Sequence, residues 1–261
     1  MQGQVTVAYS GRLAHIVLDR PARMNAMTVP MLAELAGIVE RLAHDDTTDV
    51  VLISGAGADF CSGSDVGDIA AVLALAPNDR AAAFESGMQG TIHPLIRALL
   101  DLEQVLVVSA RGHAIGLGAA LLLAADITVL SETVRISIPQ VELGHTVDHG
   151  ESFMLPRKVG LARAMQMVLL GTRLTGADAE RIGLATVVVA DETLDDTTTS
   201  VVSSLLAGSP TSLRGTKSLL SKSLDRDRES QLAAEVTAVS ACAFSEDFVA
   251  AINAKMGGRR A

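Results

Sequence analysis

Short apolar runs alternate with helix-spaced apolar residues along the front two-thirds of the chain. The runs Val5–Tyr9 and Leu13–Asp19 flank Ser10-Gly11 and predict a β-hairpin. From Thr28 to about Ala43, leucine, isoleucine and valine recur at helical spacing, which predicts a helix capped by Thr28. Four further runs predict buried strands: Val50–Ser54, Val105–Ser109, Ile127–Leu130 and Leu184–Val189.

Helical patterns separate these strands and then fill the end of the chain. Helices are expected over Arg80–Leu100 with a break at Pro94, and over Leu117–Ala125, Leu161–Leu170 and Thr175–Ile182. After Asp191 the pattern is helical, interrupted at Gly208–Pro210. Alternating strands and helices predict an α/β fold with parallel strands. We therefore expect a core domain over residues 1–195 and a C-terminal helical region over residues 196–261.

Composition narrows the function classes. The formal charge of the 261-residue chain is −9, which argues against nucleic acid as the main partner. Its two cysteines, Cys61 and Cys242, form no metal-ligand spacing, so neither a disulfide framework nor a metal site is expected. The start of the chain has no signal-peptide pattern, and the apolar run Ala114–Ala125 is shorter than the roughly 20 residues that span a bilayer. A cytoplasmic protein without a membrane partner is the expectation.

The segment Ala110–Ala125, ARGHAIGLGAALLLAA, contains the most informative pattern. Three glycines, Gly112, Gly116 and Gly118, precede an apolar helix. Because the amides at a helix start lack intrahelical partners, they can hold a negatively charged oxygen. The alternative is that these glycines only allow a helix and a strand to pack closely. No acidic or basic residue lies in the first turns of this helix.

Four segments together carry a family resemblance. They are DRPARMNAM (Asp19–Met27), GADFCSGSD (Gly57–Asp65), ARGHAIGLGAALLLAAD (Ala110–Asp126) and PQVELGHTVDHGESFMLPRKVG (Pro139–Gly160), with LTGADAERIGLATVVV following. In this order they resemble the crotonase superfamily, the enoyl-CoA hydratase/isomerase family, over roughly residues 5–257. The resemblance implies a spiral of ββα units and a C-terminal region that forms homotrimers or dimers of trimers. It also implies an acyl-CoA thioester as substrate and no separate cofactor.

The same resemblance implies an oxyanion hole built from the backbone amides of Ser64 and Leu117. Hydratases of this family use two glutamates, and the matching positions in this sequence are Ala120 and Gln140. Neither side chain exchanges protons near neutral pH, so ordinary hydration of a 2-enoyl-CoA ranks last among the hypotheses. We expect both residues to line the pocket.

A different carboxylate takes the catalytic role in this interpretation. Asp148 resembles the active aspartate of dienoyl-CoA isomerase, of ring-epoxide isomerases and of 4-chlorobenzoyl-CoA dehalogenase, and His93 resembles the dehalogenase's water-activating histidine. The dehalogenase's tryptophan is matched by Gln140, which argues against dechlorination. The structural alternatives are a turn capped by Asp148 and a capping or partly buried His93. His145 and His149 flank Asp148 and either tune its pKa or orient it, or are solvated loop histidines.

The coenzyme A site is expected at Arg23, with Ala22 and Ala26 at its edge, and the alternative is that Arg23 is a solvated surface charge. The leading hypothesis is an enoyl-CoA isomerase-type enzyme in which Asp148 carries the proton. An Asp/His hydrolase or dehalogenase and a non-catalytic acyl-CoA-binding protein are the alternatives. The sequence leaves the acyl group open.

Overall fold

A six-stranded sheet forms the centre of the computed structural model, which describes residues 3–257. Its strand order is β1 (Gln4–Ser10), β2 (Leu13–Asp19), β3 (Val50–Gly55), β4 (Val105–Ala110), β6 (Ile127–Ser131) and β8 (Val187–Val189). β1 and β2 form the predicted antiparallel hairpin, and all later neighbours are parallel. These observations confirm the predicted α/β fold with mostly parallel strands.

The last strand is shorter than predicted. The amides of Leu184 and Ala185 both donate to the carbonyl of Ala179, so these residues complete the end of the preceding helix. Only Val187–Val189 then pairs with β6. Apolar residues occupy both the end of the helix and the strand, so the apolar pattern could not show where the strand begins.

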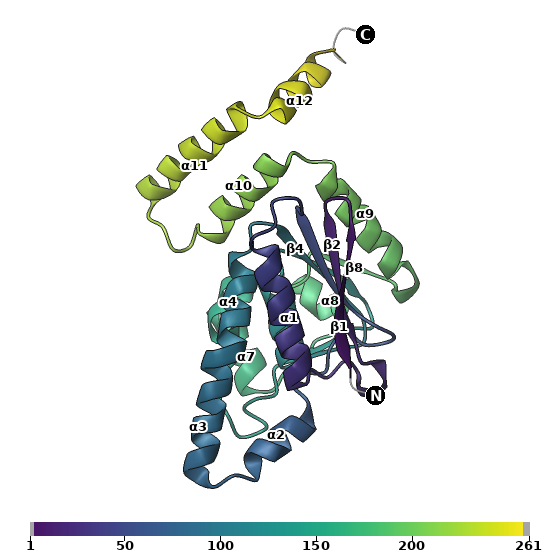
Figure 1. Ribbon diagram of the computed structural model, residues 1–261, viewed down its shortest axis with the longest axis vertical. Helices are drawn as coiled ribbons and strands as arrows, with labels where there is room; N and C mark the ends of the chain where they lie inside the picture. The colour runs from purple at the N-terminus through teal and green to yellow at the C-terminus, as the bar shows by residue number, and fades with distance from the viewer. Residues whose placement is uncertain (1–2, 258–261) are drawn as a thin grey trace.

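Helices cover both faces of this sheet (Figure 1). The predicted helix α1 (Val29–Leu42) begins at Thr28, whose side chain accepts from the amide of Met31, and it buries Leu32, Leu35, Ile38, Val39 and Leu42. The predicted Arg80–Leu100 helix begins earlier, at Pro77, and consists of α3 (Pro77–Gly87), a wider turn over Met88–Ile92, and α4 (His93–Asp101). The irregular turn precedes Pro94, which lies in the first turn of α4. The remaining helices before the C-terminal region are α2 (Val66–Leu73), α5 (Leu117–Ala124), α6 (Glu151–Val159), α7 (Leu161–Leu169) and α8 (Gly176–Arg181).

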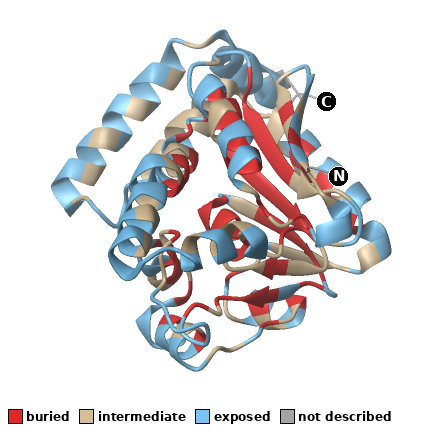
Figure 2. Cartoon of the chain, turned by 60° about the horizontal axis from the view of Figure 1, so that its bottom comes forward, coloured by how far each residue is buried: buried red, intermediate tan, exposed pale blue. Residues whose placement is uncertain are grey.

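Residues in the central strands alternate between two apolar clusters. Val51 and Val108 pack with α1, α4 and α5, whereas Val50 and Val107 pack with α9 (Leu194–Leu206) on the other face. Because both faces are covered, these strands read as continuous apolar runs. Figure 2 shows the resulting buried strands between the outer helices.

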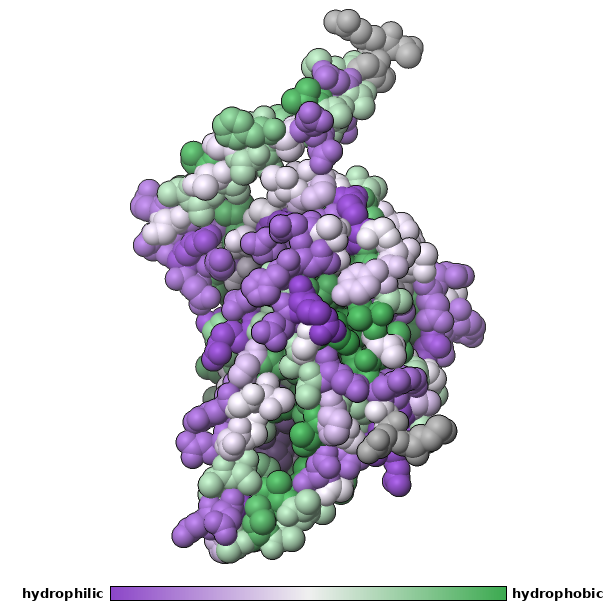
Figure 3. All heavy atoms as spheres, in the orientation of Figure 1, coloured by the Kyte–Doolittle hydropathy of each residue, from purple (hydrophilic) through white to green (hydrophobic). Residues whose placement is uncertain are grey.

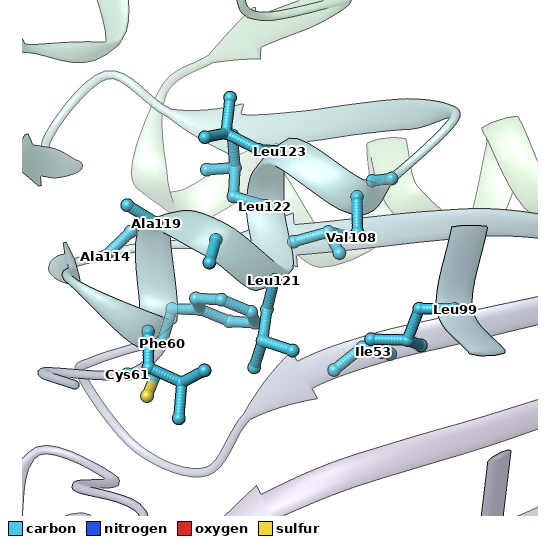
Figure 4. Close-up of a cluster of buried hydrophobic side chains, with 14 of the residues drawn as sticks. Ile53, Phe60, Cys61, Leu99, Val108, Ala114, Ala119, Leu121, Leu122 and Leu123 are labelled. Atoms are coloured by element: carbon cyan, nitrogen blue, oxygen red, sulfur yellow. The ribbon is translucent and has the colours of Figure 1, made fainter. Parts of the chain in front are cut away.

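The helix α5 is buried along its whole length. Figure 4 shows its leucines among Phe60, Ile53 and Leu99, which come from three other parts of the fold. A second, two-stranded sheet lies beside it, made of β5 (His113–Ile115) and β7 (Arg135–Ser137). Single bridges from Cys61 to Ala114 and from Met27 to Ser64 connect further segments of the chain. This small sheet gathers the glycine-rich segments in one place.

The C-terminal helices include α10 (Pro210–Ser221), α11 (Arg228–Ala243) and α12 (Glu246–Gly257). In Figure 1, α11 and α12 extend away from the rest of the chain. The predicted boundary between residues 195 and 196 falls within α9, which packs against the sheet, and the division into two regions stays a prediction. No helix within residues 3–257 is both long and apolar enough to cross a membrane, and the cytoplasmic location also stays a prediction.

Candidate active site

The glycine-rich turn has an unusual backbone conformation. Gly116 has φ +53° and ψ −114°, a conformation that side-chain-bearing residues rarely adopt, and α5 begins at the next residue, Leu117. The Gly116 amide donates to the carbonyl of Ser137 at 3.0 Å, which ties the turn to β7. Gly118 has a packing role, because an added Cβ would come 2.2 Å from the Cys61 carbonyl oxygen. The packing explanation therefore holds for Gly118, and the oxyanion role of this segment stays a prediction.

Ser64 lies on the neighbouring segment. The amide of Met27 donates to the carbonyl of Gly63, and the amide of Asp65 donates to the carbonyl of Met27, each at 2.8 Å. These flanking bonds leave the Ser64 amide outside the pairing. Within residues 3–257, neither Ser64 N–H nor Leu117 N–H donates to a protein acceptor. A Cβ placed on Gly63 would lie 3.9 Å from Leu117 N, so the two segments are adjacent.

Two polar residues that the sequence analysis did not single out hold this region. Arg20 donates to Asp65 Oδ2 at 2.5 Å, and the buried Asn25 donates to the carbonyls of Ala56 and Asp59 at 3.0 and 2.6 Å. The hydrogen bond from Arg20, with further hydrogen bonds from the amides of Asp68 and Gly67, lowers the pKa of Asp65. These contacts fix the loop that carries Ser64.

The two hydratase-glutamate positions have different surroundings. Ala120 is completely buried in the apolar core. Gln140 is 2% exposed and follows β7, whose Ser137 binds the glycine turn. The Gln140 Nε2 group donates to Glu151 Oε1 at 2.7 Å and lies 3.4 Å from Asp148 Oδ1. Gln140 therefore acts as a hydrogen-bond donor between two carboxylates.

Asp148 lies at the centre of these contacts, with 22% of its side chain exposed. Its Oδ1 atom is 3.1 Å from His149 Nδ1, and its Oδ2 atom is 3.8 Å from Nδ1 of the exposed His145. His93, at the start of α4, reaches the same residue, but its Nε2 atom is 2.9 Å from the backbone carbonyl oxygen of Asp148. The structure thus brings His93 and Asp148 together through the main chain.

His149 and Glu151 form a buried pair that sequence reasoning did not assign. Their side chains are 9% and 0% exposed, and Glu151 Oε2 also accepts from the His149 amide at 2.7 Å. Burial lowers the pKa of His149, but the hydrogen bond to Glu151 and the charges of Glu151 and Asp148 outweigh it and raise this pKa overall. For Glu151, burial raises the pKa, and the bonds and charge of His149 more than offset it. Sequence spacing gave no indication that the carboxylate of Glu151, the first residue of α6, would be buried.

The ligand atoms of Asp148, His149 and Glu151 lie within 4.8 Å of one another, a spacing that a metal ion could bridge. The Nε2 group of Gln140 points into this cluster and contacts all three residues. If the Gln140 side-chain amide were turned over, its oxygen would face the carboxylates of Asp148 and Glu151, and acceptors would then oppose one another. The arrangement fits a network of hydrogen bonds around a protonated histidine better than a set of metal ligands.

The expected coenzyme A residues form an exposed edge beside the Ser64 segment. Ala22 and Arg23 are exposed and Ala26 is partly exposed, and the amide of Ser62 donates to the Met24 carbonyl at 2.9 Å. A separate cavity of about 890 Å³ lies between α4, α6 and α10, with His93, Gly150 and Phe153 in its wall. Neither Ser64 nor Leu117 lines it.

Comparison with known proteins identifies the family and the fold. The profile of the enoyl-CoA hydratase/isomerase family matches residues 9–255. The chain belongs to this family. It is 30% identical over 252 residues to the peroxisomal Delta(3,5)-Delta(2,4)-dienoyl-CoA isomerase of Arabidopsis thaliana, covering 94% of this chain and 90% of that protein. It is 35% identical over 182 residues to the 1,2-epoxyphenylacetyl-CoA isomerase of Escherichia coli, covering 70% and 68%.

A similar solved structure comes from a Thermobifida fusca protein assigned to the enoyl-CoA hydratases and crystallised in complex with CoA. It shares 32% identity with this chain, covers 91% of each chain and superposes with a TM-score of 0.81. These relatives confirm the predicted superfamily and its fold. They include both isomerases and hydratases, so the family alone does not select the reaction.

Proposed function

We propose that this protein is an isomerase-type acyl-CoA enzyme in which Asp148 moves a proton between carbons of the acyl chain. The observation that carries this proposal is the distribution of carboxylates around Gln140. Asp148 is partly exposed, whereas the Glu151 side chain is fully buried and paired. One accessible carboxylate suits a reaction in which the same group removes a proton and returns it.

The proposed reaction proceeds through an enolate. The thioester oxygen accepts hydrogen bonds from the amides of Ser64 and Leu117, and an Asp148 oxygen takes a proton from the α or γ carbon. The electron pair of the broken C–H bond moves into the enolate, whose negative oxygen the two amides stabilise. Asp148 then gives the proton to another carbon, so the double bond shifts and the carboxylate is regenerated. Preorganised amides of this kind contribute roughly 3–4 kcal/mol each to transition-state stabilisation.

Coenzyme A is the proposed carrier of the acyl group. The exposed edge formed by Ala22, Arg23 and Ala26 adjoins the segment that carries Ser64, and Arg23 offers a guanidinium suited to phosphate. The complex of the Thermobifida fusca relative with CoA supports this choice of ligand.

Two features argue against ordinary hydration. A glutamate at Ala120 would place a carboxylate in a fully buried apolar site, and a glutamate at Gln140 would oppose Glu151 where an amide now donates at 2.7 Å. We expect the Ala120→Glu and Gln140→Glu double variant to lose stability and to gain no hydration of crotonyl-CoA.

Exchange of α-protons in D2O tests the proposal without knowledge of the acyl group. Purified protein would be incubated with a panel of 3-enoyl-CoA and 3,5-dienoyl-CoA thioesters, with double-bond position and deuterium content followed by NMR. We expect exchange and isomerisation in wild type and in Asp46→Asn, whose carboxylate is fully exposed, and loss of both in Asp148→Asn. Unchanged turnover in Asp148→Asn contradicts the assignment.

Other outcomes identify the alternatives. Tight binding by calorimetry with no exchange on the whole panel favours a non-catalytic acyl-CoA-binding protein. Release of free CoA or halide from thioester or haloacyl-CoA substrates, dependent on His93, favours the Asp/His hydrolase or dehalogenase.

We also propose that the protein forms a homotrimer or a dimer of trimers through its last helices. The supporting observation is a set of exposed apolar side chains on or next to α11 and α12: Leu232, Val236, Val239, Phe244, Phe248, Val249, Ile252 and Met256. Figure 3 shows apolar surface along this arm. Light scattering coupled to size-exclusion chromatography would measure the mass, and a monomer would overturn the proposal.

A further inference from the structure

The buried pair of His149 and Glu151 has no part in the reaction as described above. Burying a carboxylate and an imidazole carries a large desolvation cost, which requires compensating partners. Here His149 Nδ1 lies 3.3 Å from Glu151 Oε1, while Glu151 also accepts from Gln140 and from the His149 amide. The pair is well held, and it directs the histidine ring toward one further acceptor.

That acceptor is Asp148, and the contact is specific to one of its two oxygens. Oδ1 lies 3.1 Å from His149 Nδ1 and 3.4 Å from Gln140 Nε2. Oδ2 has only the exposed His145 ring nearby, at 3.8 Å, among the residues that the structure describes. The backbone of Asp148 is held separately by His93. These contacts fix one oxygen and leave the other free to meet a substrate proton.

The protonation state of His149 follows from the acceptors around Nδ1. Two carboxylate oxygens lie within 3.3 Å of this atom, and a lone pair on it would face both of them. Gln140 Nε2 is also 3.3 Å away, but its two hydrogens have acceptors in Glu151 Oε1 and Asp148 Oδ1. With Nδ1 protonated, the atom donates to Glu151 Oε1 and places its positive charge 3.1 Å from Asp148 Oδ1. The raised pKa of His149 agrees with this state, although burial acts against it.

Charged groups from neighbouring elements do not replace this cation. The helix α4 presents His93, which contacts the Asp148 carbonyl, and the exposed Arg97, which lines the cavity beside Gly150. The helix α5 carries no titratable side chain, and His145 lies on the opposite oxygen of Asp148. The positive charge nearest to Oδ1 is therefore that of His149.

We propose that His149, oriented by Glu151, is a positioning residue that holds Asp148 Oδ1 and reserves Oδ2 for proton transfer. The inference rests on the proposed function, because it assigns a role within the same site. It also has a structural part, the coupling of three ionisable groups, that is measurable without any substrate.

NMR titration of the histidine rings tests the structural part. We expect the His149 ring to remain protonated at a pH where a free histidine side chain has already lost its proton, since its pKa is raised. Both Glu151→Gln and Asp148→Asn should move the His149 midpoint to lower pH. An unchanged His149 midpoint in Asp148→Asn overturns the proposed coupling. Selective broadening of His149 signals by micromolar Mn²⁺ also overturns it, since it would mean that these residues bind a metal.

Kinetics of two His149 variants test the role in the reaction. Asparagine can present an N–H near the position of Nδ1 but carries no charge, whereas alanine removes both. We expect His149→Ala to lower kcat by about 10-fold or more with little change in KM, as for a lost hydrogen bond to a charged group. His149→Asn should recover most of kcat, because it restores a donor close to the carboxylates.

The two proposals fail in distinguishable ways. Activity that survives Asp148→Asn contradicts the proposed function. If Asp148→Asn is inactive but His149→Ala keeps the wild-type kcat, only the positioning role is overturned. If His149→Ala does not fold, the NMR titration of Asp148→Asn and the kcat and KM of His149→Asn still decide the question.

Discussion

His93 Nε2 lies 2.9 Å from the backbone carbonyl oxygen of Asp148, 55 residues further along the chain. For this contact the ring must donate its Nε2 proton, so the nitrogen that faces Asp148 is not available as a base. The first turn of α4 thereby holds the peptide of the proposed proton carrier. This geometry favours an anchoring role for His93 over activation of water.

Replacement of His93 tests the anchoring role. We expect His93→Ala to lower kcat by about 2–10-fold, the loss that corresponds to one ordinary hydrogen bond. His93→Gln, which keeps an N–H donor of similar reach, should recover most of this loss. Steady-state rates and KM for the three proteins provide the measurement. An abolished reaction in both variants would instead indicate that the ring itself takes part in the chemistry.

The oxyanion role of the Leu117 amide can be separated from the role of its side chain. Leu117 is the first residue of α5, a position where proline fits helical geometry but lacks an N–H. We expect Leu117→Ala to lose about 2–5 kcal/mol of stability from the buried side chain while retaining catalysis. Leu117→Pro should lose a further factor of about 10²–10³ in kcat relative to Leu117→Ala.

Circular dichroism and kcat would be compared between these two variants at a temperature where both are folded. Equal kcat values for the alanine and proline variants would argue against the oxyanion assignment.

A methyl group at Gly118 should disturb the same site through packing. Its Cβ would lie 2.2 Å from the Cys61 carbonyl oxygen, so the helix or the strand must move. We expect Gly118→Ala to reduce the free energy of unfolding by about 1–3 kcal/mol or more. Gly87→Ala is the matched control, because nothing lies within 4 Å of that position and the residue is in helix α3. The control should be neutral or slightly stabilising in urea denaturation.

The Arg20 and Asp65 pair makes a pH-dependent contribution to stability. The pKa of Asp65 is lowered, chiefly by the hydrogen bond from Arg20, so the folded state favours the ionised carboxylate. This stabilisation is present above the unfolded pKa of about 4 and is lost as pH falls through the lower, folded pKa.

Thermal unfolding of wild type and Asp65→Asn at a series of pH values provides the measurement for this pair. We expect wild type to have the higher Tm at pH 6 and the difference to shrink below about pH 4. A difference that stays constant down to pH 2 would contradict the assignment.

The buried pair of His149 and Glu151 should contribute to the free energy of unfolding. Removing one partner of a buried ion pair leaves an uncompensated charge, and Glu151→Ala should cost about 3–5 kcal/mol at neutral pH. Urea unfolding of Glu151→Ala and of the surface variant Glu229→Ala, whose carboxylate is 76% exposed, would measure the contrast. Similar unfolding midpoints for the two variants would show that the pair contributes little.

Local pattern was sufficient for most of the fold. The hairpin, α1, the buried strands and α5 follow from apolar spacing and from residues such as Thr28 and Pro94, whose effects act within a few positions. The helices α2 and α6 and the short strands β5 and β7 were not predicted. β5 and β7 are three-residue segments that pair with each other across the chain, so their conformation depends on a distant partner.

The candidate site divides in the same way. The sequence by itself determined that glycines precede a buried helix and that positions 120 and 140, Ala120 and Gln140, carry no ionisable side chain. These properties belong to individual residues. Only the tertiary structure decided that Gln140 donates to Glu151, that His149 contacts one oxygen of Asp148, and that His93 binds its carbonyl. Such contacts depend on how the loop after β7 packs against α4 and α6, and the partners placed there keep Glu151 and His149 charged although burial disfavours both charges.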